Sequence, residues 1–479
     1  MLLDPVAASG DEEALRFGDR ALTYAQLRGA AGAVAAAVTG HERVAVWATN
    51  ELETAIAVVG ALLAGVPAVP VNPRSGPREL EHVLGDSAPG LLLHAPGAEL
   101  PDVVTTPGHA VDSGARDDAF VAVDPGDEAT ALVVYTSGTT GPPKGVLMPR
   151  RAISSNLDAL AAAWGWTAAD RLTHGLPLFH VHGLVLGTLG PLRLGGSVEH
   201  LGRFSPAALG DALDRGATMA FGVPTMYGRL ADEAEADPAL AASLGRARLL
   251  VSGSAPLPAA LHARFERLSG QRIVERYGMS ETLMSCAVHA DGERRPGSVG
   301  PPVDGVELVL LDDDGAVLDV HDDETIGEIA VRGPNVMTGY LNRPDATAEA
   351  FRDGRFLTGD LASRAPDGYL RIVGRRATDL IKSGGFKIGA GEVESALLEH
   401  PAVAEVAVTG EPDDDLGEHV VAWVVVAPSA PAPTPQELSH HVGALLAGHK
   451  RPRVVRFVDA LPRNEMGKVQ KRALTPTEG

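Results

Sequence analysis

A loop rich in glycine and hydroxyl side chains is the strongest chemical signal in the chain. The segment at 135–145, YTSGTTGPPKG, follows an apolar run at 130–134 that we expect to be a strand, and it contains three glycines, five hydroxyl side chains and Lys144. Its backbone N–H groups and hydroxyls can surround phosphate oxygens while Lys144 supplies positive charge. Because Lys144 stands between Pro143 and Gly145, the spacing differs from the GxxxxGK[ST] loop of phosphoryl-transfer enzymes. The segment predicts a phosphate site for another nucleotide chemistry, and the alternative is a flexible turn.

Three further motifs follow in order along the chain. They are YGMSET at 277–282, TGD at 358–360 and PRNEMGK at 462–468. Each places charged or hydroxyl side chains next to glycine, a composition that by itself is also typical of turns and helix caps. The joint presence of all four motifs favours a catalytic interpretation.

Together these motifs resemble those of the adenylate-forming superfamily of acyl-CoA synthetases, carrier-protein adenylation domains and luciferases, over nearly the whole chain. The resemblance implies that a substrate carboxylate attacks the α-phosphate of ATP, which releases pyrophosphate, and that a thiol then attacks the acyl-adenylate. This chemistry needs neutralisation of negative charge rather than an enzyme nucleophile, and the chain offers one cysteine, Cys286, and no G-x-S-x-G motif. We therefore expect an AMP-forming acid–thiol ligase that uses ATP, coenzyme A and Mg²⁺.

The resemblance also implies which residues bind the nucleotide. Lys144 is expected at the phosphates, Tyr277 against the adenine, and Asp360 at the ribose hydroxyls. Glu281 is expected to ligate Mg²⁺, a hard cation suited to carboxylate oxygen. Arg376 is expected at the ribose. The other residues expected around ATP or AMP are Thr136, Ser137, Gly138, Thr139, Thr140, Gly141, Gly253, Ser254, Ala255, Gly278 and Ser280.

By the same resemblance, Lys468 is the catalytic lysine that bridges the carboxylate and α-phosphate oxygens. It lies in a tail, 449–479, that contains eight Lys or Arg and three Asp or Glu, whereas the whole chain carries a formal charge of −21. The C-terminal part is expected to present Lys468 for adenylation and then to rotate for thioester formation. The hinge and the tunnel for the pantetheine arm of CoA are expected at Thr378, Asp379, Ser383, Gly384 and Gly385.

Arg276, in ERYGMSET, predicts the kind of acid. A guanidinium beside the acyl site suits an alkyl or aryl chain poorly but can pair with a second carboxylate. His180 and His182, in PLFHVHG, lie on one face of an expected extended segment, and with Met279 they are expected to line the same pocket. His180 is also a candidate catalytic residue. Within the superfamily, ERYGMSE together with HVHG is most similar to the malonyl-CoA synthetases, which accept malonate and often methylmalonate.

Several alternatives stay open. The two histidines can be a packed pair without contact to substrate, and Arg276 can form a structural ion pair with Glu275 or Glu281. For the whole chain, the alternatives are a synthetase for short-chain or aryl monocarboxylates, an adenylation enzyme that loads a carrier protein, and a non-catalytic nucleotide-binding relative.

The elements that must hold these residues follow from the hydrophobic pattern. Strand-like runs alternate with helical patterns in the first three quarters, which predicts a doubly wound α/β fold. After about residue 300, short strands between Gly and Asp turns predict an antiparallel or β-barrel-like subdomain. A helix at 391–399 and strands at 402–409 and 419–426 predict a small, mobile α+β domain. We place the N-terminal ATP- and acyl-binding domain at 1–377 and the C-terminal domain at 378–479.

Composition limits the partners. A net charge of −21 argues against a nucleic-acid surface, which needs a basic face. The most apolar run, 55–71, is interrupted by glycines and prolines, so no membrane span is expected. The first residues lack the pattern of a secretory signal, and a single cysteine permits no internal disulfide. These features favour a cytoplasmic enzyme whose partners are a small acid, ATP and CoA; the oligomeric state is not predicted.

Overall fold

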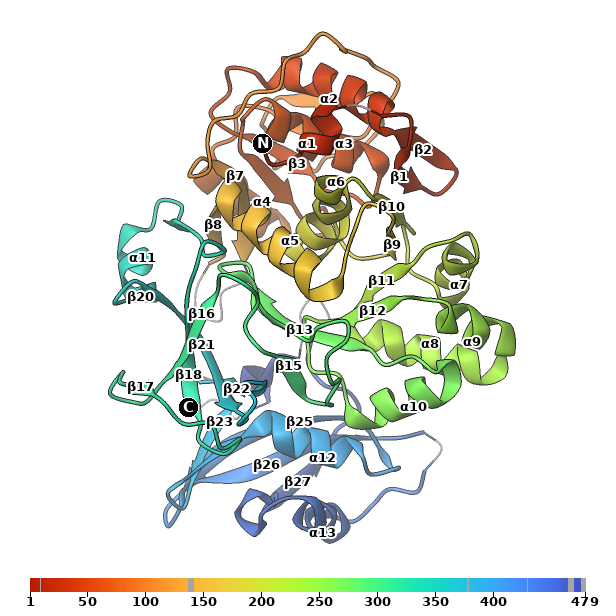
Figure 1. The fold of residues 1–479 in the computed structure, drawn as a ribbon. Helices are drawn as coiled ribbons and strands as arrows, with labels where there is room; N and C mark the ends of the chain where they lie inside the picture. Colours follow the sequence, from red (N-terminus) through yellow and green to blue (C-terminus); the bar gives the residue numbers. More distant parts are fainter. Residues whose placement is uncertain (9, 137–141, 377–378, 429, 464–468, 475–479) are drawn as a thin grey trace.

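The computed structural model describes residues 1–8, 10–136, 142–376, 379–428, 430–463 and 469–474. Figure 1 shows a layered α/β body that carries the N-terminus at the top of the view and a smaller α+β unit at the bottom, formed by the end of the chain. The expected combination of an α/β body, an antiparallel subdomain and a C-terminal α+β unit is confirmed.

The first large sheet is parallel in its interior and antiparallel at both edges. Its strands, in spatial order, are β14 (Leu283–Ala287), β13 (Val274–Met279), β12 (Leu249–Ser252), β11 (Met219–Gly222), β9 (Arg171–His174), β10 (Ser197–His200), β1 (Glu13–Phe17) and β2 (Arg20–Thr23). The helices and the π-helix between these strands are α6 (Gly190–Leu194), α7 (Pro206–Asp214), α8 (Pro224–Ala236), α9 (Pro238–Gly245), α10 (Ala259–Ser269) and η1 (His182–Leu189).

The second sheet has a parallel core of five strands and two antiparallel strands at one edge. Its strands, in spatial order, are β19 (Gly339–Tyr340), β8 (Lys144–Pro149), β7 (Thr130–Thr136), β4 (Ala68–Val71), β3 (Val44–Trp47), β5 (Leu92–His94) and β6 (Gly108–Ala110). The helices of this part are α1 (Asp4–Ala8), α2 (Tyr24–Val38), α3 (Leu52–Leu63), α4 (Pro77–Ser87) and α5 (Arg150–Trp164).

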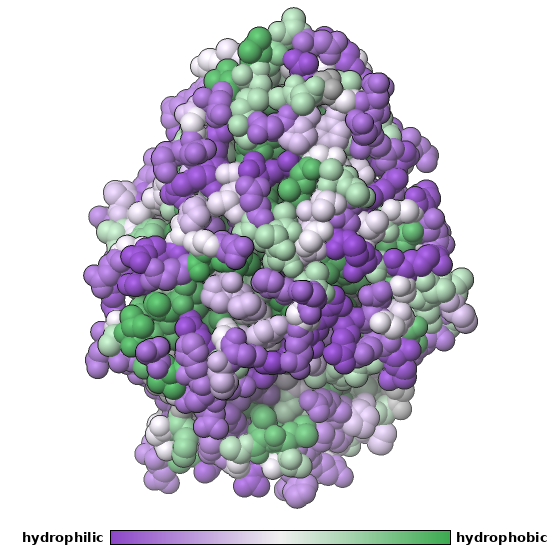
Figure 2. Space-filling model, viewed as in Figure 1, coloured by the Kyte–Doolittle hydropathy of each residue, from purple (hydrophilic) through white to green (hydrophobic). Residues whose placement is uncertain are grey.

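Buried parallel strands explain the apolar runs of the sequence. Every residue of β3 and β4 is buried, as expected for strands covered on both faces. All twelve residues of α3 are buried as well, so the apolar stretch at 55–71 belongs to a core helix and a core strand, as predicted. Among the described residues, no helix combines the length and apolar composition needed to cross a membrane. Figure 2 shows a mainly hydrophilic face with hydrophobic residues in separate patches.

The sheet type changes where the sequence predicted it. In the sheet formed between Ser298 and Arg375, all strands pair antiparallel. In spatial order they are β15 (Ser298–Gly300), β22 (Leu370–Arg375), β21 (Arg355–Arg364), β18 (Gly327–Arg332), β16 (Glu307–Leu311) and β17 (Val317–Leu318), with β20 (Phe351–Arg352) paired to β21 and preceded by α11 (Pro344–Ala350).

The last sheet takes all its strands from the chain from Leu380 onward. Its elements are β24 (Phe386–Gly389), β23 (Leu380–Ser383), β26 (Gly417–Val426), β25 (Val403–Asp413) and β27 (Val454–Phe457), with α12 (Ala390–Leu398), α13 (Pro435–Leu445) and the short helices η2 (Gly448–Lys450) and η3 (Lys471–Ala473). It has its own apolar core, to which Ile381, Val393 and Leu438 belong. The domain boundary proposed between 377 and 378 falls on two residues outside the described ranges, between β22 and β23, and stays a prediction.

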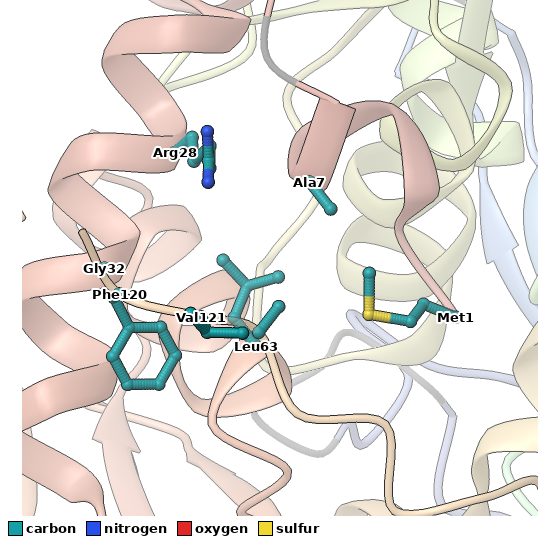
Figure 3. Close-up of a pocket in the computed structure, with 8 residues that line it drawn as sticks. Met1, Ala7, Arg28, Gly32, Leu63, Phe120 and Val121 are labelled. Atoms are coloured by element: carbon teal, nitrogen blue, oxygen red, sulfur yellow. The ribbon is translucent and has the colours of Figure 1, made fainter. Parts of the chain in front are cut away.

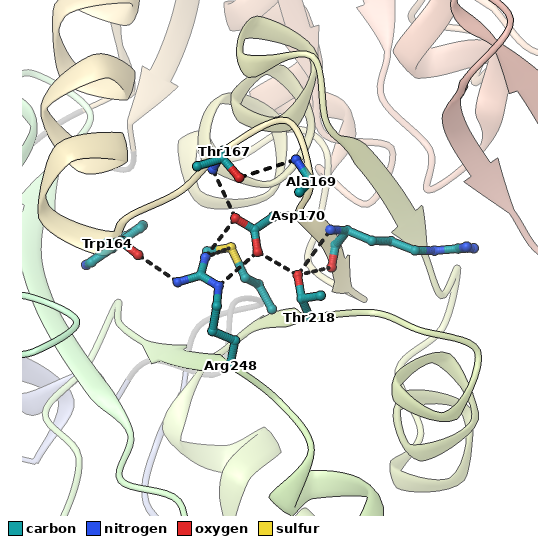
Figure 4. A network of polar contacts seen from close by, with 8 residues as sticks. Trp164, Thr167, Ala169, Asp170, Thr218 and Arg248 are labelled. Atoms are coloured by element: carbon teal, nitrogen blue, oxygen red, sulfur yellow. Dashed lines mark hydrogen bonds and ion pairs between the residues drawn. The ribbon is translucent and has the colours of Figure 1, made fainter.

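A partly buried polar network holds the first sheet to the helix that precedes it (Figure 4). Asp170 accepts hydrogen bonds from Nε and Nη2 of Arg248 at 2.9 and 2.8 Å, from the backbone N–H of Thr167 at 2.9 Å and from the hydroxyl of Thr218 at 2.8 Å. Arg248 Nη1 also donates to the backbone oxygen of Trp164, the last residue of α5, at 2.8 Å. The network thereby joins β9, β11 and β12 at the ends opposite the predicted site residues.

Candidate active site

The Gly/Thr/Ser segment connects two antiparallel strands. Thr136, the last residue of β7, is in register with Lys144, the first residue of β8, so the two flank the connection between the strands of this hairpin. The Tyr135 hydroxyl donates to Oδ2 of Asp86 in α4 at 2.8 Å, which anchors this end of β7. The predicted phosphate ligands between the strands, Ser137, Gly138, Thr139, Thr140 and Gly141, lie outside the described residues.

Lys144 and Glu281 both contact Tyr340, Lys144 at the ring and Glu281 at the hydroxyl. The Lys144 ammonium lies 4.5 Å from the centre of the Tyr340 ring, and the Tyr340 hydroxyl donates to Oε1 of Glu281 at 3.0 Å. Glu281 is buried, and burial raises the pKa of its carboxyl, opposed by the Tyr340 hydrogen bond and by the charges of Arg375 and Lys144. A buried carboxylate held by one neutral hydroxyl and flanked by cations suits a divalent cation and phosphates.

The YGMSET motif forms the hairpin that carries Glu281. Tyr277 and Gly278 belong to β13, and the chain returns as β14 from Leu283. A side chain at Gly278 would place its Cβ 1.9 Å from the backbone oxygen of Leu283, so the close approach of the two strands needs glycine at this position. Leu283 itself adopts a positive φ of 48°, an uncommon conformation that is often found at functional sites. Met279 and Ser280 are partly buried at the same tip.

Asp360 is held from both sides by motif residues. Its Oδ2 accepts a hydrogen bond from the Tyr277 hydroxyl at 2.7 Å, and its Oδ1 lies 2.7 Å from Nε of Arg375, the residue that is in register with it on β22. Burial and the Asp360 charge raise the pKa of Tyr277 well above its usual value, so the hydroxyl keeps its proton. Arg376, expected at the ribose, instead places Nη1 2.7 Å from Oε2 of Glu328. The arginine beside Asp360 is therefore Arg375, one residue before the expected one.

The loop after β12 carries the residues expected at the adenine. Gly253 is buried, whereas Ser254 and Ala255 are exposed. Ser254 adopts a positive φ of 70°, a strained conformation for a residue other than glycine. Ser252, which was not predicted, ends β12 immediately before this loop, and its buried hydroxyl has no hydrogen-bond partner among the described residues.

Arg276 is a buried cation whose Nε and Nη2 have no hydrogen-bond partner in the part of the chain that the structure describes. Burial lowers the pKa of its guanidinium to about 10, which leaves it charged at neutral pH. The two acids considered as structural partners are engaged elsewhere: Glu275 accepts from His262 Nε2 at 2.9 Å, and Glu281 accepts from Tyr340. A buried charge without a partner costs several kcal/mol, so an anion bound against these two nitrogens would stabilise the side chain.

The histidine segment differs from its predicted conformation. His180 lies in a bend, and His182 begins the π-helix η1, so the two residues do not share one face of an extended segment. The buried apolar run after His182 continues as a helix, and π-helical turns are frequent at functional sites. Burial lowers the pKa of His180 to about 4, and burial followed by the charge of Arg276 lowers that of His182. Both imidazoles are therefore neutral, and neither nitrogen of His182 has a partner among the described residues.

The expected hinge lies beside the last residues of the described tail. Asp379 places Oδ1 2.6 Å from Nζ of Lys471 and accepts a hydrogen bond at Oδ2 from the backbone N–H of Arg375 at 2.9 Å. Ser383 is buried at the end of β23, and the turn that follows contains Gly384 and Gly385, both at positive φ. Thr378 and the predicted catalytic Lys468 lie outside the described residues.

Two other features bear on ligands. A cavity of about 200 Å³ lies near the N-terminus and is shown in Figure 3; its lining includes Met1, Arg28, Leu63 and Phe120, none of which belongs to a motif. No group of three or more His, Cys, Asp or Glu side chains in the described ranges could hold a metal ion. A divalent cation at Glu281 would therefore depend on oxygen ligands from the bound nucleotide and water, as is usual for Mg²⁺ in nucleotide sites.

Sequence reasoning missed Tyr340, Arg375 and Ser252. Tyr340 lies on β19, far along the chain from Lys144, and only the pairing of β19 with β8 brings the two together. Arg375 follows Gly374 and is the last residue of β22. Its place at the end of a strand was the sequence feature that could have indicated a functional residue.

The chain resembles known proteins over most of its length. Residues 4–341 match the AMP-binding enzyme family, and residues 392–468 match the AMP-binding enzyme C-terminal domain. A malonate–CoA ligase of Arabidopsis thaliana is 37% identical over 475 residues, which cover 90% of this chain and 77% of that protein. A solved malonyl-CoA ligase with methylmalonyl-CoA and AMP bound is 60% identical, covers 96% of this chain and 99% of its own, and superposes with a TM-score of 0.75. ATP-bound MatB from Rhodopseudomonas palustris is 34% identical, with coverages of 99% and 97% and a TM-score of 0.90.

Proposed function

The chain belongs to the AMP-binding enzyme family, and on that basis we propose that it ligates a small dicarboxylic acid, malonate and also methylmalonate, to CoA through an acyl-adenylate. One observation carries the choice of acid: the buried guanidinium of Arg276 has two nitrogens without a partner among the described residues. A distal carboxylate would satisfy them with charge-assisted hydrogen bonds. The solved relative with methylmalonyl-CoA bound supports the same class of acid.

The nucleotide site is proposed at the meeting point of three sheets. Tyr277 and Asp360 are placed at the adenosine, with Arg375 on the far side of Asp360. Lys144 neutralises phosphate charge and, with Arg375, offsets the negative charge that gathers as the acid attacks the α-phosphate. Glu281 is the residue that would hold Mg²⁺, and the bound cation would neutralise phosphate oxygens. We retain Arg376 only as a residue near this site, since its guanidinium pairs with Glu328.

The acid is proposed to bind between Arg276 and the buried end of η1. His182 is neutral and unpartnered among the described residues, so it can donate to or accept from a bound carboxyl group. His180 is also neutral at the pH of any assay near 7, since its pKa is about 4. The two imidazoles would thereby add polar contacts without adding charge, which leaves Arg276 to set the preference for a dianion.

The two halves of the reaction are proposed to use different arrangements of the C-terminal domain. The ATP-bound relative superposes with a TM-score of 0.90 at 34% identity, and the product complex with 0.75 at 60% identity. A lower score at much higher identity supports a difference in arrangement rather than in fold. Lys468 would act in the first arrangement, and Gly384 and Gly385 would border the pantetheine path in the second. We place the reaction in the cytoplasm, which fractionation of cells that express the protein would test.

The test is thioester formation from ATP and CoA with malonate, methylmalonate, acetate, butyrate or benzoate, by the wild type and by Arg276→Ala. A charge-assisted contact contributes roughly 1.5–3 kcal/mol, so the variant should lose roughly ten- to hundredfold in kcat/KM for the two dicarboxylates. Arg264→Ala is the control, because Arg264 pairs with Asp232 and Glu235 on the surface. A monocarboxylate as the preferred acid would reject the choice of acid. Pyrophosphate release without any CoA thioester would indicate a carrier-protein substrate instead.

A further inference from the structure

Gly253 lies against the guanidinium of Arg276. A Cβ added to Gly253 would stand 2.2 Å from Cζ, 2.4 Å from Nε and 2.6 Å from Nη1 of that side chain. These are its three nearest neighbours, and no backbone atom is among them. Real Cβ atoms do not approach other atoms this closely, so any larger residue at 253 displaces the guanidinium.

The backbone does not explain this glycine. Gly253 is absent from the residues that adopt a positive φ, whereas the next residue, Ser254, adopts φ of 70° with a side chain present. The position that would favour glycine for conformational reasons therefore carries serine, and glycine occupies the position that touches Arg276. The feature that requires glycine at 253 is the space that the guanidinium fills.

From this arrangement we propose that Gly253 is a positioning residue for acid specificity: its missing side chain seats the Arg276 guanidinium where the distal carboxylate of the acid binds. The inference rests on the proposed function and assigns Gly253 a role beyond the expected adenine contact. Nε and Nη2, the two nitrogens without partners in the described ranges, belong to the Arg276 guanidinium that lies against Gly253. Displacing that group by the radius of a methyl group removes it from hydrogen-bond distance, because such bonds weaken steeply with geometry.

The experiment is a double-mutant cycle with Gly253→Ala, Arg276→Ala and the double variant. In the presence of Arg276, Gly253→Ala should lower kcat/KM for malonate by about tenfold or more and lower the malonate-to-butyrate ratio with it. In the Arg276→Ala background the same alanine should change kcat/KM less than about twofold, because the methyl group then occupies free space. The KM for ATP should stay within about threefold throughout. Gly228→Ala, on α8, is the matched control, since a Cβ there meets nothing within 4 Å.

Two results would overturn the proposal. An adenine contact as the main role of Gly253 predicts a raised KM for ATP in both backgrounds and an unchanged ratio of malonate to butyrate. The second readout does not depend on the acid: crystal structures of the wild type and Gly253→Ala without substrate should differ in the position of the guanidinium. An unmoved guanidinium rejects the proposal. If the wild type ligates no dicarboxylate, the proposed function fails, but these two crystal structures still decide whether Gly253 seats Arg276.

Discussion

The hydroxyl of Tyr277 lies 2.7 Å from Oδ2 of Asp360, although 83 residues separate the two along the chain. The contact joins the edge of the first sheet to the antiparallel subdomain, because Tyr277 lies on β13 and Asp360 on β21. The same carboxylate is held at its other oxygen by Arg375. Two motifs that look unrelated in the sequence thus form one surface for the proposed ribose and adenine.

Tyr277→Phe should weaken ATP binding and leave the KM for the acid unchanged. The ring is kept, but Asp360 loses a hydrogen bond to a charged acceptor, which is worth roughly 1.5–3 kcal/mol when intact. Because Arg375 still holds the other oxygen, we expect the lower end of this range, a rise of about tenfold in the KM for ATP. Steady-state kinetics with varied ATP and varied malonate would measure both constants.

The control for this change is Tyr24→Phe. Tyr24 also donates a buried hydrogen bond, to the backbone oxygen of Gly196 at 2.7 Å, but it lies outside the proposed site. It should alter stability without altering the KM for ATP. Equal effects of the two substitutions on that KM would show that the Tyr277 hydroxyl has no specific role.

Glu281→Gln should raise the Mg²⁺ concentration needed for pyrophosphate release by about tenfold or more, because a neutral amide is a poorer ligand for a hard cation than a carboxylate. Burial raises the pKa of Glu281, so the wild type should lose Mg²⁺-dependent activity as pH falls, starting above the usual range of a glutamate. The variant should lack this acid limb. Rates measured against Mg²⁺ at several pH values would show both effects.

Glu328→Gln is the matched control, since Glu328 pairs with Arg376 and not with any residue proposed to hold the cation. It should leave the Mg²⁺ dependence unchanged. A wild-type Mg²⁺ requirement that survives in Glu281→Gln would remove Glu281 from the proposed metal site. A strong effect of Glu328→Gln on the KM for ATP would instead restore Arg376 as a nucleotide contact.

Much of the architecture follows from the sequence, because burial imposes it directly. The run at 55–71 is apolar enough to be a core helix and a core strand, and α3 and β4 occupy it. Contacts between residues on different strands depend instead on strand register, which the sequence does not give directly. Arg375 reaches Asp360 because β21 and β22 pair in one register, and a shift of one residue would have brought Arg376 there instead.

The histidine segment shows a second limit of sequence reasoning. The letters HVHG fit the period of two of a strand, yet His182 begins a π-helix. Short apolar runs are compatible with either conformation, and tertiary packing decides between them. Here Gly183 packs so closely on Pro177 that an added Cβ would lie 2.3 Å from the Pro177 backbone oxygen, a close approach that the local sequence pattern does not predict.

Asp170→Asn should lower the stability of the body, with the effect largest near neutral pH. Burial opposes ionisation of Asp170, but hydrogen bonds from Arg248, Thr167 and Thr218 outweigh it and lower the pKa of the carboxyl (Figure 4). Removing one partner of a largely buried pair costs roughly 3–5 kcal/mol, and partial exposure of Arg248 places the expectation nearer 2–3. Thermal unfolding of the wild type and the variant at pH 7 would measure the difference.

The sign of the pH dependence follows from the lowered pKa. The contribution of Asp170 is fully present above its unfolded pKa of about 3.9 and is lost as pH falls through the lower folded value. The gap between wild type and Asp170→Asn should therefore shrink below about pH 4. Asp158→Asn breaks an exposed pair with Arg193 and should cost less than about 1 kcal/mol. A gap that widens in acid would contradict this account.

Lys471 connects the C-terminal tail to the proposed nucleotide site. Its Nζ lies 2.6 Å from Oδ1 of Asp379 and 2.7 Å from Oε1 of Glu394 in α12. Asp379 in turn accepts from the backbone N–H of Arg375, whose side chain holds Asp360. A mostly buried ammonium between two carboxylates fixes the chain three residues after the predicted catalytic Lys468.

Lys471→Met should therefore slow adenylation more than thioester formation. Loss of the ammonium leaves Asp379 and Glu394 facing each other without a cation, which is unfavourable where the groups are largely buried, and the tail loses its anchor. We expect ATP–pyrophosphate exchange to fall by about tenfold or more, since misplacement of a catalytic group by about 1 Å can cost a hundredfold. Conversion of supplied malonyl-adenylate to the CoA thioester, which the resemblance does not assign to Lys468, should change less than about threefold.

Lys450→Met, which removes an ion pair with Glu392 in the same domain, is the control. Equal losses in both half-reactions would mean that Lys471 only supports the fold of this domain.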